Sequence, residues 1–296
     1  KFPMLFPILY GLILYTFPEL ETALIFFTIL ILAESHFGAT WPFFINKVNY
    51  NYIKERKTNL IIIPIVLIFF CIGGFFLFKS FFLLIFFTAN VYHVTRQSNG
   101  IMSLYIKDNL QNKTYTSLIY LFNLIFFLIG FFRFYYPIIN EENLFYLNII
   151  IVFILISVLF IQNLKFGFSE NSLTLITGIL IFYPICFVTN PVHAIIMGVT
   201  MHYSQYLYLT SKVIKKRSEE NISEKGYFKK FLIIIFAYSI IMSLFSVIGK
   251  YDESLIFLKN LLLIPITGQM LHFYLDTQLW KFSEPHNKKN VLKYIL

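Results

Sequence analysis

The stretch LIIIPIVLIFFCIGGFFLF, from Leu60 to Phe78, decides the fold class of this chain. It carries no charged residue, and about 18–20 apolar residues are enough for a helix to cross the hydrocarbon core of a bilayer. Phe228–Ile248 is a second run of similar length. The whole chain is 58% hydrophobic and 13% charged, whereas soluble domains carry about 25% charged residues. We therefore expect an all-α, polytopic helical membrane protein.

Apolar runs separated by charged or proline-marked breaks predict about ten transmembrane helices. The expected spans are 2–17, 20–45, 59–78, 80–95, 114–134, 143–163, 171–189, 191–211, 228–249 and 255–280. The gaps between them are about 20 residues or shorter, which is too short for a soluble domain. Residues 1–296 are therefore expected to form a single integral-membrane domain.

The basic residues predict the orientation, because membrane-flanking loops rich in Lys and Arg stay in the cytoplasm. With an even number of spans, both termini lie on one side. Of the 24 Lys and Arg residues, only Lys79, Arg133, Lys250 and Lys259 then fall on the opposite side. We expect cytoplasmic termini. The net charge of +9 reflects loops that contact anionic membrane lipids, and it indicates no nucleic-acid partner.

Ionisable residues inside the apolar runs point to a buried site. Four of the six histidines lie on different expected spans, together with two carboxylates: His36, His93, His202, His272, Glu34 and Asp276. Three of these histidines lie at a similar depth, about 15 Å from the cytoplasmic end of their helices, and His93 is shallower. A bilayer tolerates such groups where they pair, line a cavity or hold an ion. We expect a metal site in the cytoplasmic half of the membrane; a proton or ion pathway and unrelated structural histidines are the alternatives.

The spacing of these residues suggests their roles. His272 and Asp276 are one helical turn apart, which suits two ligands of one ion, or one ligand and the carboxylate that orients it. Gln269 lies on the same span as a supporting residue. The same spacing joins His93 to Gln97, which begins a polar segment expected to be re-entrant or interfacial.

Glu34 and His36 are two positions apart, so their side chains face different directions unless the helix is broken there. Gly38 and Pro42 favour a local break. Glu34 is expected to be a ligand or an acid that orients an imidazole. His193 follows an Asn-Pro pair and is expected to be a helix-start or access residue.

Imidazole and carboxylate donors suit iron, zinc or manganese. The absence of cysteine from these positions argues against a structural zinc site. Iron with several histidine ligands and open positions supports reactions with O2, and apolar helices give a lipid-soluble substrate lateral access. Fe²⁺ is therefore the expected cofactor, with zinc as the alternative. O2, a lipid-soluble substrate and membrane lipids are the expected partners.

Three segments, taken in order, resemble a known family: Ser35-His36-Phe37-Gly38-Ala39, then Thr200–Tyr206, and then Gln269–Trp280 followed by Pro285-His286. They are similar to segments of the bacterial retinal-forming β-carotene dioxygenases, the bacteriorhodopsin-related-protein family. The resemblance implies an enzyme of the bacterial inner membrane that uses iron and O2 to cleave a carotenoid to retinal. Tyr206 stands in place of the second histidine of the family's His-x-x-x-His pair. His286, in the cytoplasmic tail, is expected to be solvated.

The leading hypothesis is an iron-dependent membrane oxygenase. The expected metal ligands are His36, His93, His202 and His272; the expected catalytic residues are Asp276, Glu34 and Tyr206; the supporting residues are Gln97, Gln269 and His193. The alternatives are a lipid hydroxylase or desaturase, a zinc-type lipid hydrolase or transferase, and a proton-coupled transporter. The two halves show no convincing internal repeat, which counts against a transporter.

Overall fold

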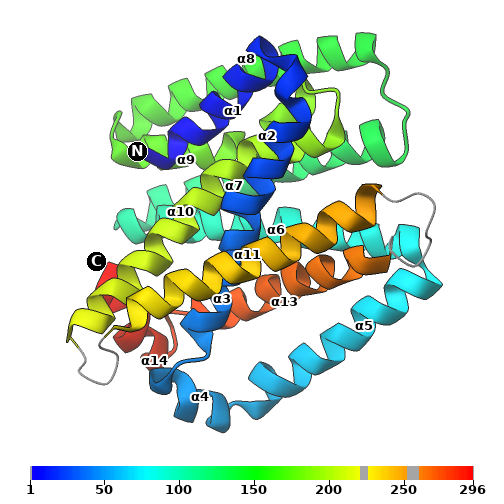
Figure 1. Cartoon of the computed structure of the whole chain (residues 1–296). Helices are drawn as coiled ribbons and strands as arrows, with labels where there is room; N and C mark the ends of the chain where they lie inside the picture. Colours follow the sequence, from blue (N-terminus) through cyan, green and yellow to red (C-terminus); the bar gives the residue numbers. More distant parts are fainter. Residues whose placement is uncertain (1, 221–225, 252–259, 296) are drawn as a thin grey trace. The chain divides into compact units, whose positions relative to one another are not determined.

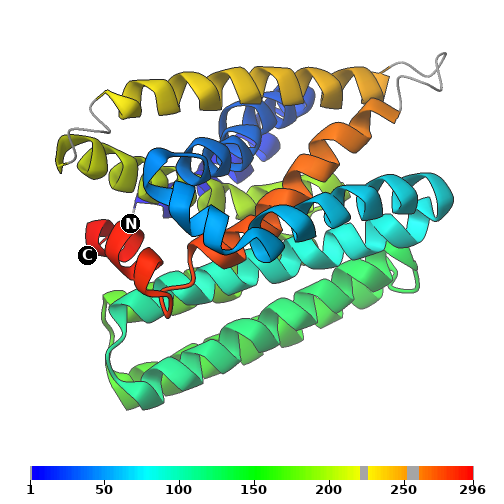
Figure 2. The ribbon, with the colours of Figure 1, turned by 90° about the horizontal axis from the view of Figure 1, so that it is seen from below.

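The computed structural model describes residues 2–220, 226–251 and 260–295, and every regular element within these ranges is a helix (Figures 1 and 2). The predicted all-α fold class is confirmed. The chain divides into two compact units. The first comprises Lys1–Pro18 and Asn90–His202, and the second comprises Glu19–Ala89 and Tyr203–Leu296. Two continuous helices, α6 (Lys79–Tyr105) and α10 (Pro191–Glu220), contribute residues to both units.

The first unit otherwise consists of α1 (Leu5–Thr16), α7 (Asn109–Gly130) with a π-helical turn η6 (Phe131–Tyr135), α8 (Glu141–Phe166), α9 (Glu170–Leu180) and a 3-10 turn η7 (Tyr183–Cys186). Side chains cap the long helices: Asp108 accepts a hydrogen bond from the Gln111 amide at 2.6 Å, and Asn140 accepts one from the Asn143 amide at 2.7 Å. These caps satisfy amides that have no partner inside the helix. Gly167 ends α8 with a φ of +73°, the left-handed conformation that glycine adopts at low cost.

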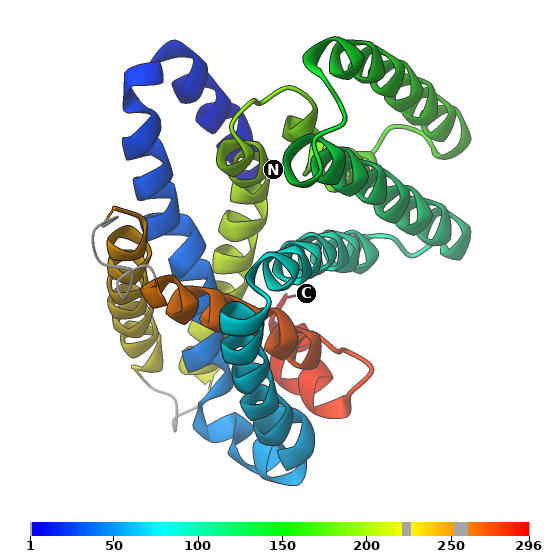
Figure 3. The same ribbon diagram turned by 90° about the vertical axis from the view of Figure 1, so that its right-hand side faces the viewer.

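The second unit consists of α2 (Glu21–Thr28), a π-helical turn η3 (Ile29–Ala33), α3 (Glu34–Phe44), α4 (Tyr50–Glu55), a π-helical turn η5 (Thr58–Ile62), α5 (Ile63–Leu77), α11 (Tyr227–Tyr251), α13 (Leu263–Leu279) and the C-terminal pieces α14 (Pro285–Asn287), η10 (Lys288–Leu292) and α15 (Lys293–Ile295). Short 3-10 turns occupy Phe2–Met4, Pro18–Leu20, Lys47–Asn49 and Asn260–Leu262. Helix α3 packs along α11 (Figure 1), and α13 packs against α5 (Figure 3).

Two glycines let three helices of the second unit approach one another around Tyr238 on α11. A Cβ atom at Gly38 of α3 would lie 2.7 Å from Cδ1 of Tyr238, and one at Gly268 of α13 would lie 2.6 Å from its hydroxyl oxygen. Real Cβ atoms do not come this close to other heavy atoms. The absence of side chains at these two positions therefore lets α3 and α13, the helices that carry the candidate site, both pack directly against Tyr238.

Within the described ranges, five helical segments are long and apolar enough to cross a membrane: Pro18–Phe44, Thr58–Leu77, Asn109–Tyr135, Glu141–Phe166 and Tyr227–Val247. In two of them, Thr58–Leu77 and Glu141–Phe166, only 17% of the most apolar 18-residue stretch is buried within the protein. Such large exposed apolar surfaces are typical of proteins that contact a membrane or a partner. The helices thus support membrane association, and the expected number of ten spans stays a prediction.

Several expected elements differ in detail. The span expected at 171–189 is interrupted, because α9 ends at Leu180 and Pro184 then lies in a 3-10 turn; proline lacks the amide that an interior helical position requires. The polar segment that begins at Gln97 is not a re-entrant loop, because α6 continues through it to Tyr105; its expected interfacial position stays a prediction. Helix α13 begins at Leu263, and the first part of the span expected at 255–280 lies outside the described residues.

The expected helix break at Gly38 or Pro42 is wrong. Helix α3 runs without interruption from Glu34 to Phe44 and includes both residues. Pro42 lies in the last turn of this helix, where the loss of one backbone hydrogen bond disturbs little of the helix that follows. The irregular turn lies instead at Ile29–Ala33, immediately before Glu34, and is π-helical. Such turns are rare, and they often occur at functional sites.

Candidate metal centre

The second unit contains a buried cluster of polar side chains between α3 and α13. Helix α3 supplies His36 and Thr40, α13 supplies His272 and Asp276, and α10 adds Tyr206. The members of each helical pair are four positions apart, so they lie on one helix face. All five side chains of this α3–α13 cluster are at most 2% exposed. Because buried polar groups are costly without partners, their contacts indicate what the cluster does.

The hydroxyl of Thr40 lies at the centre of the cluster. Its Oγ1 is 2.6 Å from Nδ1 of His272, 3.0 Å from Oη of Tyr206 and 3.4 Å from Oδ1 of Asp276. Tyr206 also donates its hydroxyl hydrogen to Oδ1 of Asp276 at 2.7 Å. One oxygen of the carboxylate therefore receives the hydrogen bonds of the cluster. The other, Oδ2, lies 3.6 Å from Nε2 of His272.

His36 completes the cluster through ring contacts. The centroid of its imidazole is 4.4 Å from that of His272, with the rings inclined at 67°. It is also 4.4 Å from the ring of Tyr206, at 72°. These edge-to-face contacts bring two imidazoles and the Asp276 carboxylate into one buried region of the second unit.

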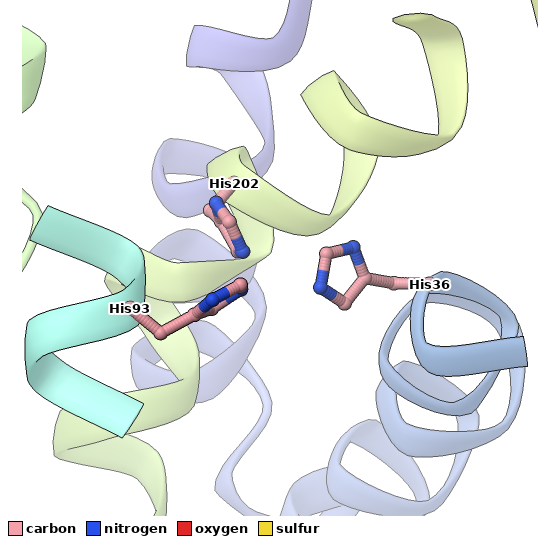
Figure 4. Close-up of side chains that lie close together, drawn as sticks. All are labelled: His36, His93 and His202. Atoms are coloured by element: carbon pink, nitrogen blue, oxygen red, sulfur yellow. The ribbon is translucent and has the colours of Figure 1, made fainter. Parts of the chain in front are cut away.

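The first unit contributes a second pair of buried imidazoles. His93 on α6 is 5% exposed and His202 on α10 is 1% exposed. Their rings meet edge to face, with centroids 5.4 Å apart and an angle of 87° between the planes. Figure 4 shows these two side chains pointing toward each other from α6 and α10; the third histidine drawn there, His36, belongs to the second unit.

The chemistry of these side chains fits a transition metal. The four imidazoles and the carboxylate of Asp276 are buried groups that could hold a metal ion, each with one ligand atom. Nitrogen and oxygen donors of this kind are accepted by iron, zinc and manganese. Each histidine of the set was expected from the sequence to be a ligand. The structure places each of them in the interior, and their role as ligands stays a prediction.

Glu34 is also buried, with 1% of its surface exposed. Its Oε1 accepts a hydrogen bond of 3.4 Å from the Gln269 side chain, so the expected supporting residue Gln269 contacts Glu34 and joins α13 to α3. The groups of possible ligands found within the described part of the chain do not contain Glu34. The structure thus places Glu34 on the first turn of α3, and its expected catalytic role stays a prediction.

The groups of possible ligands found among the described residues include neither His193 nor Gln97. His193 is in the first turn of α10, where its Nδ1 is 2.7 Å from the hydroxyl of Tyr10 in the same unit. Gln97 follows His93 by one turn on α6. The expectation of a solvated His286 holds only in part, because the residue is half-buried. Its ring stacks on Tyr52 with centroids 4.2 Å apart, and its Nε2–H donates to Oδ1 of Asn49 at 2.7 Å. Helix α14 therefore lies against α4, and this contact covers part of the ring.

Sequence reasoning missed Thr40. Threonine is a common residue in apolar helices, and its hydroxyl usually bonds to a carbonyl in the preceding turn, as Thr210 does with the carbonyl of Tyr206 at 2.8 Å. The available signal was the four-residue spacing from His36, which puts Thr40 on the same face of α3. Contact with His272, however, depends on the packing of α3 against α13.

Comparisons of the chain with protein-family models, with curated proteins and with solved structures find no match. The residues of the chain itself therefore carry the functional argument. The resemblance to the carotenoid-cleaving family rests on three short segments and stays a prediction.

Proposed function

We propose that this chain is an iron-dependent membrane oxygenase that acts on a lipid-soluble substrate. The observation that carries the proposal is the set of four buried imidazoles and one buried carboxylate in an all-helical chain with long apolar helices. Charged and metal-binding groups are rare inside such proteins and usually mark a functional site. Iron held by histidines and a carboxylate supplies a redox centre at which O2 reacts with an organic substrate.

The proposed ligands are His36, His272 and Asp276 of the second unit and His93 and His202 of the first. Helix α10 continues from the first unit into the second, and Tyr206 follows His202 on it by one turn. Tyr206 does not ligate the ion in this proposal. Its hydroxyl holds Oδ1 of Asp276, which fixes the carboxylate and leaves Oδ2 for the metal.

Elemental analysis of the purified protein tests this proposal. We expect iron in the purified wild type, and a lower iron content in His272→Ala and in His202→Ala. His193→Ala is the matched control, because this buried histidine bonds to Tyr10 and lies outside the ligand groups. A purified protein without a transition metal, or ligand variants that keep the metal content of the wild type, would refute the metal centre. Stoichiometric zinc without O2 consumption would favour a lipid hydrolase or transferase instead.

Within this proposal the most specific substrate is a carotenoid such as β-carotene, cleaved by O2 to retinal. The support is the resemblance of the segments around His36, His202 and His272, together with the apolar surface of the helices. Expression in a bacterium that makes β-carotene tests it. We expect loss of the orange colour and accumulation of retinal, and neither in the His272→Ala strain. Persistent colour with iron-loaded protein would refute the carotenoid while leaving the metal centre intact.

We further propose about ten spans and cytoplasmic termini in a bacterial inner membrane, on the basis of the positive-inside distribution of Lys and Arg. The cytoplasmic half of the membrane would then contain the metal. Fusion of a reporter that is active only in the cytoplasm to the C-terminus tests this orientation. An active fusion is the expected result, and activity of a periplasmic reporter at the same position would contradict it.

A further inference from the structure

We propose that Thr40 is a positioning residue that holds the imidazole of His272 with Nε2 toward the metal. The inference rests on the metal centre proposed above. Its structural basis lies within the second unit: Oγ1 of Thr40 is 2.6 Å from Nδ1 of His272, the shortest of the hydrogen bonds that Thr40 makes. A metal-bound histidine donates the hydrogen of its other ring nitrogen to a nearby acceptor, which fixes the orientation of the ring.

The hydrogens of the cluster can be assigned from its fixed acceptor. The carboxylate of Asp276 only accepts, and Tyr206 donates to its Oδ1 at 2.7 Å. When Nε2 of His272 binds a metal, the ring hydrogen of the neutral imidazole is on Nδ1. Nδ1–H then donates to Oγ1 of Thr40, and the Thr40 hydroxyl donates to Oδ1 of Asp276 at 3.4 Å or to the Tyr206 oxygen at 3.0 Å. Every hydrogen in this chain of bonds finds an acceptor.

The same assignment gives Asp276 two functions through its two oxygens. Oδ1 is the end of the chain of hydrogen bonds that starts at His272. Oδ2 lies 3.6 Å from Nε2 of His272, so both atoms face the same region and are placed to bind one ion. Thr40 thus links a metal ligand to the carboxylate that lies beside the same ion, and the linkage passes between α3 and α13.

Thr40 reaches His272 because α3 packs against α13. The missing side chains at Gly38 and Gly268 bring α3 and α13 close to Tyr238. Thr40 is two residues beyond Gly38 on α3 and is completely buried. Its methyl group is held in a packed interior, which restricts rotation about χ1 of this β-branched residue and keeps the hydroxyl in place between His272 and Tyr206.

Cobalt(II) binding by the detergent-solubilised full-length protein tests the role of Thr40. Thr40→Val keeps the shape of the side chain and removes the hydroxyl, and Thr40→Ser restores the hydroxyl. We expect cobalt affinity about 10- to 100-fold weaker in Thr40→Val, with an altered visible spectrum. The cobalt affinity of Thr40→Ser should lie within about 3-fold of that of the wild type, because serine keeps the hydroxyl. In the wild-type cobalt protein, proton NMR should show a slowly exchanging ring N–H from His272, and this signal should exchange faster in Thr40→Val.

The controls separate this inference from the metal centre itself. Thr210→Val removes an equally buried hydroxyl that bonds only to helix carbonyls, and it should keep wild-type affinity and spectrum. His272→Ala should lose binding. If the wild type binds no cobalt, or His272→Ala binds it normally, the metal centre fails and the role of Thr40 fails with it. If the metal centre holds but Thr40→Val has wild-type affinity, spectrum and N–H exchange, only the role of Thr40 is overturned.

Discussion

Tyr206 contributes a single hydroxyl to the interior, and its removal deletes a hydrogen bond to a buried carboxylate together with the contact to Thr40. In Tyr206→Phe, Oδ1 of Asp276 loses the donor that lies 2.7 Å away. Hydrogen bonds to charged groups contribute about 1.5–3 kcal/mol, so we expect the metal-free protein to lose stability of this order. Thermal unfolding in detergent measures the loss. Tyr208→Phe, two residues further along α10 and 62% exposed, is the control. Equal stability of both variants would contradict the hydrogen bond.

His286, in the C-terminal segment, makes the free energy of unfolding depend on pH. Partial burial, followed by the positive charge of Arg217, lowers the pKa of this imidazole below its ordinary value of 6.5. The unfolded chain therefore binds a proton more readily than the folded chain at a pH just below 6.5. By linkage, the free energy of unfolding decreases as the pH falls from about 6.5 and levels off below the folded pKa.

Unfolding curves of the wild type and of His286→Gln between pH 5 and pH 8 measure this contribution; the range brackets the ordinary histidine pKa, about 6.5. The difference in stability between the two proteins should shift in favour of the variant as the pH falls. A difference that stays constant over this range, or that moves in favour of the wild type, would contradict the placement of the ring against Tyr52 and Asn49.

At the scale of helices, the contact of α3 with α11 depends on Gly38. The methyl group of Gly38→Ala would lie 2.7 Å from the Tyr238 ring, and relief of such a clash by movement of packed helices costs about 1–3 kcal/mol. Gly73→Ala is the control, because no atom lies within 4 Å of the added methyl on α5; alanine is favoured there by about 1 kcal/mol. We expect thermal unfolding to show a lower midpoint for the first variant and an equal or higher midpoint for the second.

The same helix contact connects packing to the metal. Displacement of α3 in Gly38→Ala would move Thr40 away from His272, since both contacts lie on α3 two residues apart. Weaker metal binding in Gly38→Ala than in Gly73→Ala is therefore expected alongside the loss of stability. Unchanged metal affinity in the first variant would show that α3 absorbs the added methyl without moving Thr40.

At the scale of the whole molecule, a bound metal should stabilise the folded chain by mass action. A ligand that binds only the folded state adds about 2.7 kcal/mol at 100 times its dissociation constant. Removal of the metal by a chelator should lower the unfolding temperature, and readdition of Fe²⁺ should restore it in a concentration-dependent way. His272→Ala should not respond to either treatment. A wild type insensitive to chelator and metal would contradict a metal bound by the interior histidines.

Much of the site could be predicted from the sequence because ionisable residues are rare in apolar helices. His36, His93, His202, His272 and Asp276 were recognisable by type and by position in the apolar runs, and all five are buried. The predicted break at Pro42 failed for a local reason: the sequence marks proline and glycine but does not show which turn becomes irregular. That turn is Ile29–Ala33, which contains neither residue.

The sequence by itself determined the helical fold class, the apolar helices and the residue types of the candidate site, because these follow from composition and from spacing along single helices. Only the tertiary structure decided which polar side chains meet. Thr40 and His272 are far apart in the chain, and their hydrogen bond requires α3 and α13 to pack against each other, while glycines at positions 38 and 268 leave room for Tyr238 beside both helices. The partial burial of His286 likewise required α14 to lie against α4. Contacts between distant segments depend on the shapes of packed surfaces, which periodicity along one helix does not specify.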